Sequence, residues 1–153
     1  MSFNSETPVI FAGVSSVTSS RGSKDPELGV RVSKGGNQYI YVYNAASASD
    51  AYPGMGMTLI NGATNYSCTI STTAGLDQPV GVVQNATIAA GSYGWLLTKG
   101  IGTAYTSAAI AAGTSVQIAA NGLWTTGATF TVGKLLAVTS AATNITGSAY
   151  FAL

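Results

Sequence analysis

The sequence predicts an all-β protein, a compact sandwich or small barrel preceded by an extended N-terminal arm. Short apolar runs alternate with period two and are separated by glycine and small polar residues, as in strands joined by tight turns. No segment keeps the 3.6-residue apolar period of an amphipathic helix. With 153 residues, 46% of them hydrophobic, the chain can bury one sizeable core.

Charge divides the chain into two parts. Most charged residues precede Gly36, and those that follow are Asp50, Asp77, Lys99 and Lys134. We therefore expect an arm over Met1–Gly36 and a β body over Asn37–Leu153. Within the arm, Ser15–Asp25 has the serine-rich, apolar-poor composition of a linker, and Leu28–Val32 alternates like a short edge strand.

The clearest strand of the body is expected over Gln38–Asn44. Its alternation places three tyrosines on one face and two aliphatic residues on the other, Tyr39, Tyr41 and Tyr43 against Ile40 and Val42. Further strands are expected over Met57–Ile60, Ser67–Ser71, Val80–Val83, Gly94–Thr98, Ser115–Ile118, Leu123–Thr126, Lys134–Thr139 and Ala149–Leu153.

Turn signals separate these strands. Asn121-Gly122 lies between two apolar runs and predicts a hairpin. Ile88–Ser92 (IAAGS) is echoed by Ile110–Thr114 (IAAGT), and each leads into a strand. Both are therefore expected to be tight turns that feed successive strands. Two copies of so short a motif do not by themselves indicate a repeat fold.

The sequence contains few residues of the types that enzymes most often use for catalysis. The chain has no histidine, which removes the commonest general base and the commonest metal ligand. Cys68, the single cysteine, has no histidine to activate it and is expected to be buried in a strand. Asp50 and Asp77 lie in turn sequences, where aspartate caps or bends the chain. We expect no catalytic residue, no cofactor, no metal ion and hence no enzyme.

The surface is expected to be poor in charge. Charged residues make up 7% of the chain, against about 25% in average proteins, and the net charge is +1. No basic patch suits nucleic acid, no apolar stretch could span a membrane, and no signal peptide is evident. Such a surface suits a protein that neighbours cover, so we expect partners that include copies of the chain itself.

The aromatic residues of the body have two interpretations. Aromatic stripes on strands are usually core or subunit interface, and we expect this of Tyr39, Tyr41, Tyr43, Trp95 and Trp124. If they were exposed on the monomer, they would form a stacking platform for sugars. A carbohydrate-binding or adhesive module of a phage fibre or bacterial surface protein is therefore the alternative.

Several segments, taken in order, resemble the head decoration (capsid cement) proteins of tailed bacteriophages. They are Gln38–Ala45 (QYIYVYNA), Gly54–Thr58 (GMGMT), Gln78–Gln84 (QPVGVVQ), Ile88–Leu96 (IAAGSYGWL) and Lys99-Gly100. The resemblance covers about Gln38 to Gly122. It implies a jelly-roll or tulip-like decoration fold and a homotrimer on the outer capsid surface of a virion, made in the host bacterial cytoplasm.

The resemblance also implies contacts with the major capsid protein through terminal extensions. The arm has no counterpart in it, but its apolar residues suit such a role. We expect contact with the capsid or a neighbouring subunit from Phe3, Val9, Ile10, Phe11 and Val14. Ser15–Asp25 would supply the reach.

Overall fold

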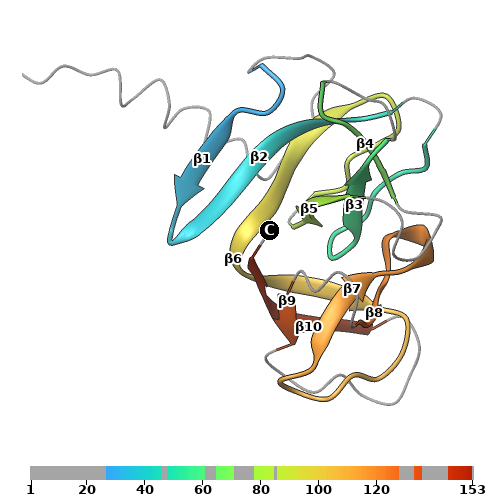
Figure 1. Ribbon diagram of the computed structural model, residues 1–153. Helices are drawn as coiled ribbons and strands as arrows, with labels where there is room; N and C mark the ends of the chain where they lie inside the picture. The colour runs from blue at the N-terminus through green and yellow to red at the C-terminus, as the bar shows by residue number, and fades with distance from the viewer. Residues whose placement is uncertain are drawn as a thin grey trace, which may run out of the picture.

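The computed structural model describes residues 27–45, 48–60, 65–70, 78–84, 86–127, 133–135 and 145–152. Within these ranges 58% of the residues lie in strands and the helical element is one short 3₁₀ turn, η1 (Ala120–Gly122), so the predicted all-β class is confirmed (Figure 1). The strands are β1 (Arg31–Lys34), β2 (Asn37–Asn44), β3 (Gly56–Leu59), β4 (Ser67–Ile70), β5 (Pro79–Val83), β6 (Tyr93–Thr106), β7 (Ser115–Ile118), β8 (Trp124–Thr126), β9 (Gly133–Leu135) and β10 (Ile145–Ala152).

The strands close into two five-stranded rings that share β6. The first ring runs β2-β4-β3-β5-β6 and closes because β2 also pairs with β6. The second runs β6-β10-β9-β7-β8 and closes because β6 also pairs with β8. In Figure 1 the first barrel lies above the second, and β6 passes from one to the other. Closure pairs the edges that an open sheet would leave exposed.

The two barrels repeat one pattern of strand pairing. In each, the first strand is parallel to the third: β2 to β4, and β6 to β8. The second strand is antiparallel to the third and the fourth, as β3 is to β4 and β5, and β7 to β8 and β9. The fifth strand is antiparallel to the fourth and the first. The chain therefore contains one five-stranded unit twice, and β6 belongs to both units.

The equivalence of the barrels extends to single residues. Cys68 pairs with the last residue of β2, and Trp124 pairs with the last residue of β6. The next backbone bond also recurs: Ala45 N–H donates to Cys68 O at 3.0 Å, and Ser107 N–H donates to Trp124 O at 2.9 Å. Strand positions in one barrel therefore have equivalent positions in the other, and Cys68 and Trp124 are one such pair.

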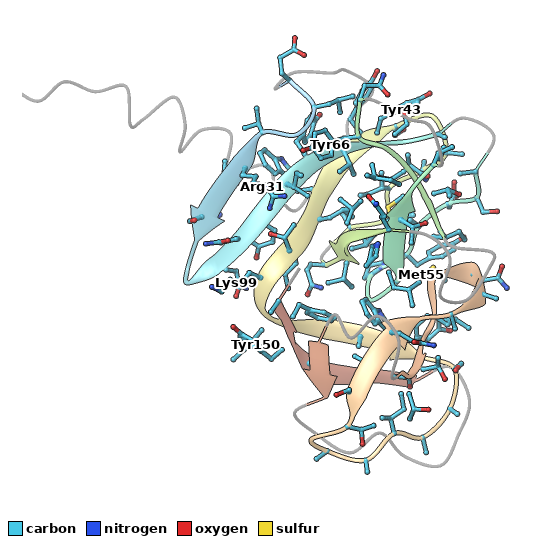
Figure 2. The ribbon with its side chains drawn as sticks, in the orientation of Figure 1. Arg31, Tyr43, Met55, Tyr66, Lys99 and Tyr150 are labelled. Carbon is cyan, nitrogen blue, oxygen red and sulfur yellow. The ribbon has the colours of Figure 1, made fainter. Side chains whose placement is uncertain are left out.

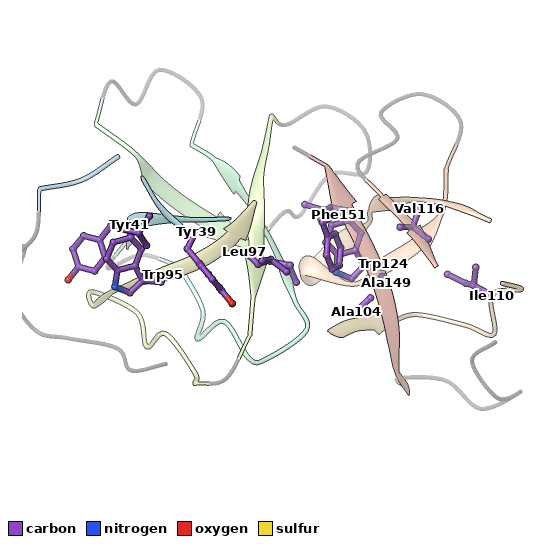
Figure 3. Close-up of a cluster of buried hydrophobic side chains, with 13 residues drawn as sticks. Tyr39, Tyr41, Trp95, Leu97, Ala104, Ile110, Val116, Trp124, Ala149 and Phe151 are labelled. Carbon is purple, nitrogen blue, oxygen red and sulfur yellow. The ribbon is translucent and has the colours of Figure 1, made fainter. Parts of the chain in front are cut away.

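Each barrel encloses its own apolar cluster. The first contains Ile40, Val42, Ala51, Met57, Cys68, Ile70, Val80, Val83, Ile88 and Leu96. The second cluster fills the interior of the second barrel. It continues over the outer face of β2 and β6 to Tyr39, Tyr41 and Trp95 (Figure 3). The alternation predicted for Gln38–Asn44 is confirmed, because its aliphatic residues and these tyrosines belong to different clusters.

Two glycines bring the barrels together just before and at the start of β3. Gly54 O accepts hydrogen bonds from Tyr105 N–H at 2.9 Å and from Trp124 Nε1–H at 2.8 Å. A Cβ on Gly56 would lie 2.5 Å from Ile118 Cγ1. Since real carbon atoms do not approach so closely, this backbone contact requires glycine.

The predicted turns are present. Gly91 and Gly113 have φ of 75° and 80°, in the left-handed region that favours glycine. Ile88 and Ile110, three residues before them, are buried in the first and second clusters. The hairpin predicted at Asn121-Gly122 joins the antiparallel strands β7 and β8, and both of its residues have positive φ.

Several strand boundaries differ from expectation, and the differences in β1, β6 and β10 are informative. The edge strand expected over Leu28–Val32 is β1, shifted toward the C-terminus, so part of the region assigned to the arm is hydrogen-bonded to β2. β6 continues well past Thr98, because its glycines break the apolar pattern without ending the strand. β10 begins at Ile145, four residues before the expected start.

Candidate functional site

The five arm residues expected to contact a capsid or a neighbouring subunit lie outside the described part of the chain. They are Phe3, Val9, Ile10, Phe11 and Val14. Their role stays a prediction.

The aromatic residues expected to be core or interface lie mostly inside the single chain. Tyr41 and Trp124 are 0% exposed and Trp95 is 3% exposed. Tyr39 is also buried, whereas Tyr43 is half-buried. The four buried side chains therefore do not form the exposed stacking platform that the carbohydrate-binding alternative placed on them, whereas Tyr43 is partly exposed.

A chain of ring contacts leads from this core to the surface. The ring centroids of Trp95 and Tyr41 lie 5.0 Å apart, those of Tyr41 and Tyr93 6.2 Å, and those of Tyr93 and Tyr43 4.9 Å. Tyr43 and Tyr93 are both half-buried. The aromatic packing of the core thus ends in partly exposed phenol rings.

The half-buried rings line a cleft of about 520 Å³ on the first barrel. We call it the tyrosine cleft, and its lining residues are Glu27, Leu28, Tyr43, Asn65, Tyr66, Ser67 and Tyr93. They come from the segment before β1, the end of β2, the start of β4 and the start of β6. Figure 2 shows Tyr43 and Tyr66 near each other at the end of the barrel.

Tyr66 is held in the cleft by an unusual backbone conformation. Its φ is 49°, in the left-handed region that residues other than glycine rarely adopt. Its carbonyl accepts a hydrogen bond from Tyr43 N–H at 3.2 Å. Its ring packs against Gly29, where an added Cβ would lie 2.6 Å from Tyr66 Cδ2. On the rim, Ser67 Oγ lies 3.3 Å from Asn65 Oδ1, a hydrogen-bonding distance.

Three charged side chains, those of Asp50, Lys99 and Glu27, lie in different parts of the fold. Asp50 Oδ1 accepts a hydrogen bond from Ala90 N–H at 2.9 Å, so this carboxylate braces the turn before β6, which is distant in the sequence. In the described ranges no three histidine, cysteine, aspartate or glutamate residues gather as metal ligands would. Lys99 is exposed on β6, and Glu27 is the charged residue that lines the tyrosine cleft.

Cys68 lies in the interior of the first barrel, as predicted. Its side chain is 0% exposed. Burial raises the pKa of the thiol from its ordinary value of 9.0 to about 12, because the thiolate would lose its hydration. The thiol therefore stays protonated near neutral pH and is a poor nucleophile.

An apolar pair faces solvent on the outside of the second barrel. Ile101 of β6 is 60% exposed and Tyr150 of β10 is 39% exposed, and the two are directly opposed across the strands. Lys99 and Ala152, which form the opposed pair two residues along, are also exposed. We call these four residues the Ile101–Tyr150 patch; Figure 2 labels Lys99 and Tyr150.

No pattern in the sequence predicted the cleft or the patch as a whole, although Tyr43 of the cleft belonged to the expected aromatic face. Tyr66 belonged to no expected strand, Ile101 lay beyond the strand expected over Gly94–Thr98, and Tyr150 lay within the strand expected over Ala149–Leu153. Both sites depend on which strands pair.

Among the described residues, no helix has the length and apolar character needed to cross a membrane. No protein-family model and no curated protein matches this sequence.

Proposed function

We propose that this chain is a non-enzymatic structural protein that decorates and stabilises the outer surface of a bacteriophage capsid as a homotrimer. The observation that supports an assembly role is the Ile101–Tyr150 patch on a body with few charges. Two large apolar side chains in opposed positions gain free energy when a neighbour covers them. Support for a phage shell as the partner comes from the resemblance of the sequence motifs between Gln38 and Gly122, taken in order, to head decoration proteins.

The proposed stabilisation is a linkage effect. A protein that binds the assembled shell but not its free subunits shifts the equilibrium toward the shell by mass action. In a trimer, three arms are tethered to one body. Once one arm is bound, the others act at high effective concentration, so each contact can be weak while the trimer stays in place.

Two features of the described residues support a role without chemistry. The thiol of Cys68 is buried and protonated, and the carboxylate of Asp50 is used to brace a turn. The sequence has no histidine to act as a general base.

The mass of the purified protein in solution tests the self-association. We expect light scattering after gel filtration to give a trimer of the 15.4 kDa chain. Tyr150→Ser should shift it toward monomer because it removes the ring from the patch. Tyr52→Ser is the matched control, since Tyr52 is 51% exposed and lies outside the patch. A monomeric wild-type protein would reject the trimer, and an unchanged Tyr150→Ser trimer would reject the patch as its interface.

Removal of the arm tests the contact with the shell. We expect the chain without Met1–Val14 to remain a folded trimer but to lose co-sedimentation with capsid shells. The controls are the circular dichroism spectrum and the mass of the truncated protein. Co-sedimentation equal to that of the full chain would contradict the role given to the arm.

A further inference from the structure

We infer that the tyrosine cleft is a binding site for a neutral saccharide, a function beyond the proposed packing role. The cleft places sugar recognition at half-buried tyrosines rather than at the buried tryptophans. Of these tyrosines, Tyr43 belonged to the expected aromatic face, whereas Tyr66 and Tyr93 did not. Its argument rests on a comparison between the two barrels, on the backbone of Tyr66 and on the chemistry of the lining residues.

The second barrel shows that the fold does not need the cleft residues. Cys68 and Trp124 occupy equivalent register positions, so Tyr66 and Ser67 correspond to Gly122 and Leu123. One barrel therefore closes with a glycine and an apolar residue where the other has a phenol and a hydroxyl.

Tyr93, a second tyrosine of the cleft, also has no aromatic counterpart in the second barrel. Tyr43 pairs with Tyr93 between β2 and β6, and the equivalent pair between β6 and β10 is Tyr105 with Thr146. The barrel thus accepts threonine where the cleft has Tyr93. The second unit thus folds without an aromatic residue at the positions of Tyr66 and Tyr93, although Tyr43 is matched by Tyr105. Barrel architecture alone therefore does not account for Tyr66 and Tyr93.

The backbone of Tyr66 carries a conformational cost. Gly122 has φ 69° and Tyr66 has φ 49°, so both equivalent positions are left-handed. A residue other than glycine pays about 1–2 kcal/mol in this region. Glycine would relieve that cost, as it does in the second barrel. A strained residue that persists beside an open cleft indicates that its side chain has a use.

The same comparison argues against a second copy of this chain as the occupant. At the equivalent place on the second barrel, the glycine turn of the first barrel docks so closely that a Cβ on Gly122 would lie 2.7 Å from Gly56 O. Tyr66 puts a side chain at this position. Tyr43 N–H is also engaged by Tyr66 O, whereas its equivalent, Tyr105 N–H, binds the docked turn. An occupant of the cleft must therefore pack between the tyrosine rings, because the backbone N–H of Tyr43 is not available for a hydrogen bond.

The lining of the cleft matches the two chemical faces of a pyranose. The C–H face of a sugar packs on an aromatic ring, and its hydroxyls need both donors and acceptors around it. The rim supplies an amide at Asn65, a hydroxyl at Ser67 and a carboxylate at Glu27. The charged group among the described lining residues is the carboxylate of Glu27, which disfavours a phosphate or an acidic sugar and so favours a neutral one. The volume of about 520 Å³ lies within the usual range for small-ligand sites.

Saturation-transfer NMR on the full chain tests the inference. The probes are the methyl β-glycosides of glucose, galactose and N-acetylglucosamine. Tetramethylammonium and a proline-rich decapeptide represent the other classes that aromatic clefts bind. We expect at least one glycoside to bind at millimolar concentration, with the strongest transfer to its ring C–H protons. Binding of no glycoside, or tighter binding of the ammonium ion or the peptide, would overturn the inference.

Two variants locate the binding. Tyr66→Gly should weaken it at least tenfold while preserving the fold, because the second barrel uses glycine at this place. Asn65→Ala, on an exposed rim residue, should weaken it severalfold. Tyr52→Ala is the control, since this exposed tyrosine lies outside the cleft. Unchanged affinity in both cleft variants would place the sugar elsewhere. Trimer mass and shell binding are measured separately, so either proposal can fail alone.

Discussion

The joint between the barrels predicts a steric coupling between Gly56 and Ile118. In Gly56→Ala, the new methyl group would lie 2.5 Å from Ile118 Cγ1, 2.6 Å from Ile118 Cδ1 and 3.0 Å from Trp124 Cζ2. Carbon atoms in contact normally lie about 3.5–4.0 Å apart, so the side chains must move. Overpacking of this kind costs about 1–3 kcal/mol.

The partner substitution removes the obstacle. Ile118→Ala deletes both of the closest atoms and, because Ile118 is 6% exposed, leaves a cavity that costs about 2–5 kcal/mol. In the double variant the new methyl group enters that cavity. We therefore expect the double variant to be no less stable than Ile118→Ala alone, which makes the coupling about as large as the cost of Gly56→Ala.

Urea denaturation of the four proteins measures the coupling. Each kcal/mol should also appear as a shift of about 2–4 °C in melting temperature. Ser115→Ala is the control, because Ser115 occupies the position in the second barrel that Gly56 occupies in the first. We expect it to change stability by less than about 0.5 kcal/mol. Additive effects of Gly56→Ala and Ile118→Ala would refute the close contact between the barrels.

Two further predictions concern the interior of the first barrel. Because burial raises the pKa of Cys68 from 9.0 to about 12, the thiol contributes no pH dependence to stability below 9.0 and a loss of stability as pH rises from 9.0 toward 12. Cys68→Ala should remove that part of the slope, and a chromogenic disulfide reagent should label wild type at pH 8 only after unfolding; rapid labelling of the native protein would show that the thiol is accessible. Asn44, 0% exposed, donates through Nδ2 to Ile88 O at 2.8 Å and to Ser49 O at 3.0 Å, so Asn44→Ala should lower the free energy of unfolding by about 2 kcal/mol in urea titrations. Wild-type stability in that variant would mean that these bonds contribute nothing net.

The strands were predictable where side-chain alternation is strong. Gln38–Asn44 separates aromatic from aliphatic residues so regularly that both its existence and its two faces could be expected. The second half of β6 could not, because Gly100 and Gly102 leave no continuous alternation. Their need for glycine arises from tertiary contacts: a Cβ on Gly102 would lie 2.5 Å from Leu97 Cδ2.

The duplication was hidden for a related reason. The echo between Ile88–Ser92 and Ile110–Thr114 joins positions that are not equivalent, since one precedes the fifth strand of its barrel and the other precedes the second. The true counterparts preserve hydrogen-bond register rather than residue type, as Cys68 and Trp124 illustrate. The apolar pattern and the turns set the register of neighbouring strands, but the closure of a barrel also pairs strands that are distant in the sequence, and no local pattern encodes those pairings.

The candidate sites depended on the same long-range pairing. Tyr66 and Tyr93 lie far apart in the sequence and come together because β4 and β6 both flank β2. Ile101 and Tyr150 meet only through the pairing of β6 with β10. Predicting that the aromatic side chains pack was within reach of the sequence, but predicting which of them stay exposed was not.

The shared strand β6 also fixes the distance between the tyrosine cleft and the Ile101–Tyr150 patch. Since β6 passes from one ring to the other as continuous hydrogen-bonded backbone, no linker separates the barrels. The tyrosine cleft draws on the start of β6 and the Ile101–Tyr150 patch on its second half, so the two surfaces are spaced by a single element. On an ordered lattice, trimers joined through the patch would present their clefts at regular intervals and in orientations related by the trimer symmetry. A ligand with repeating sugars would then meet an array whose period is set by the lattice, with each cleft held at the same offset from it.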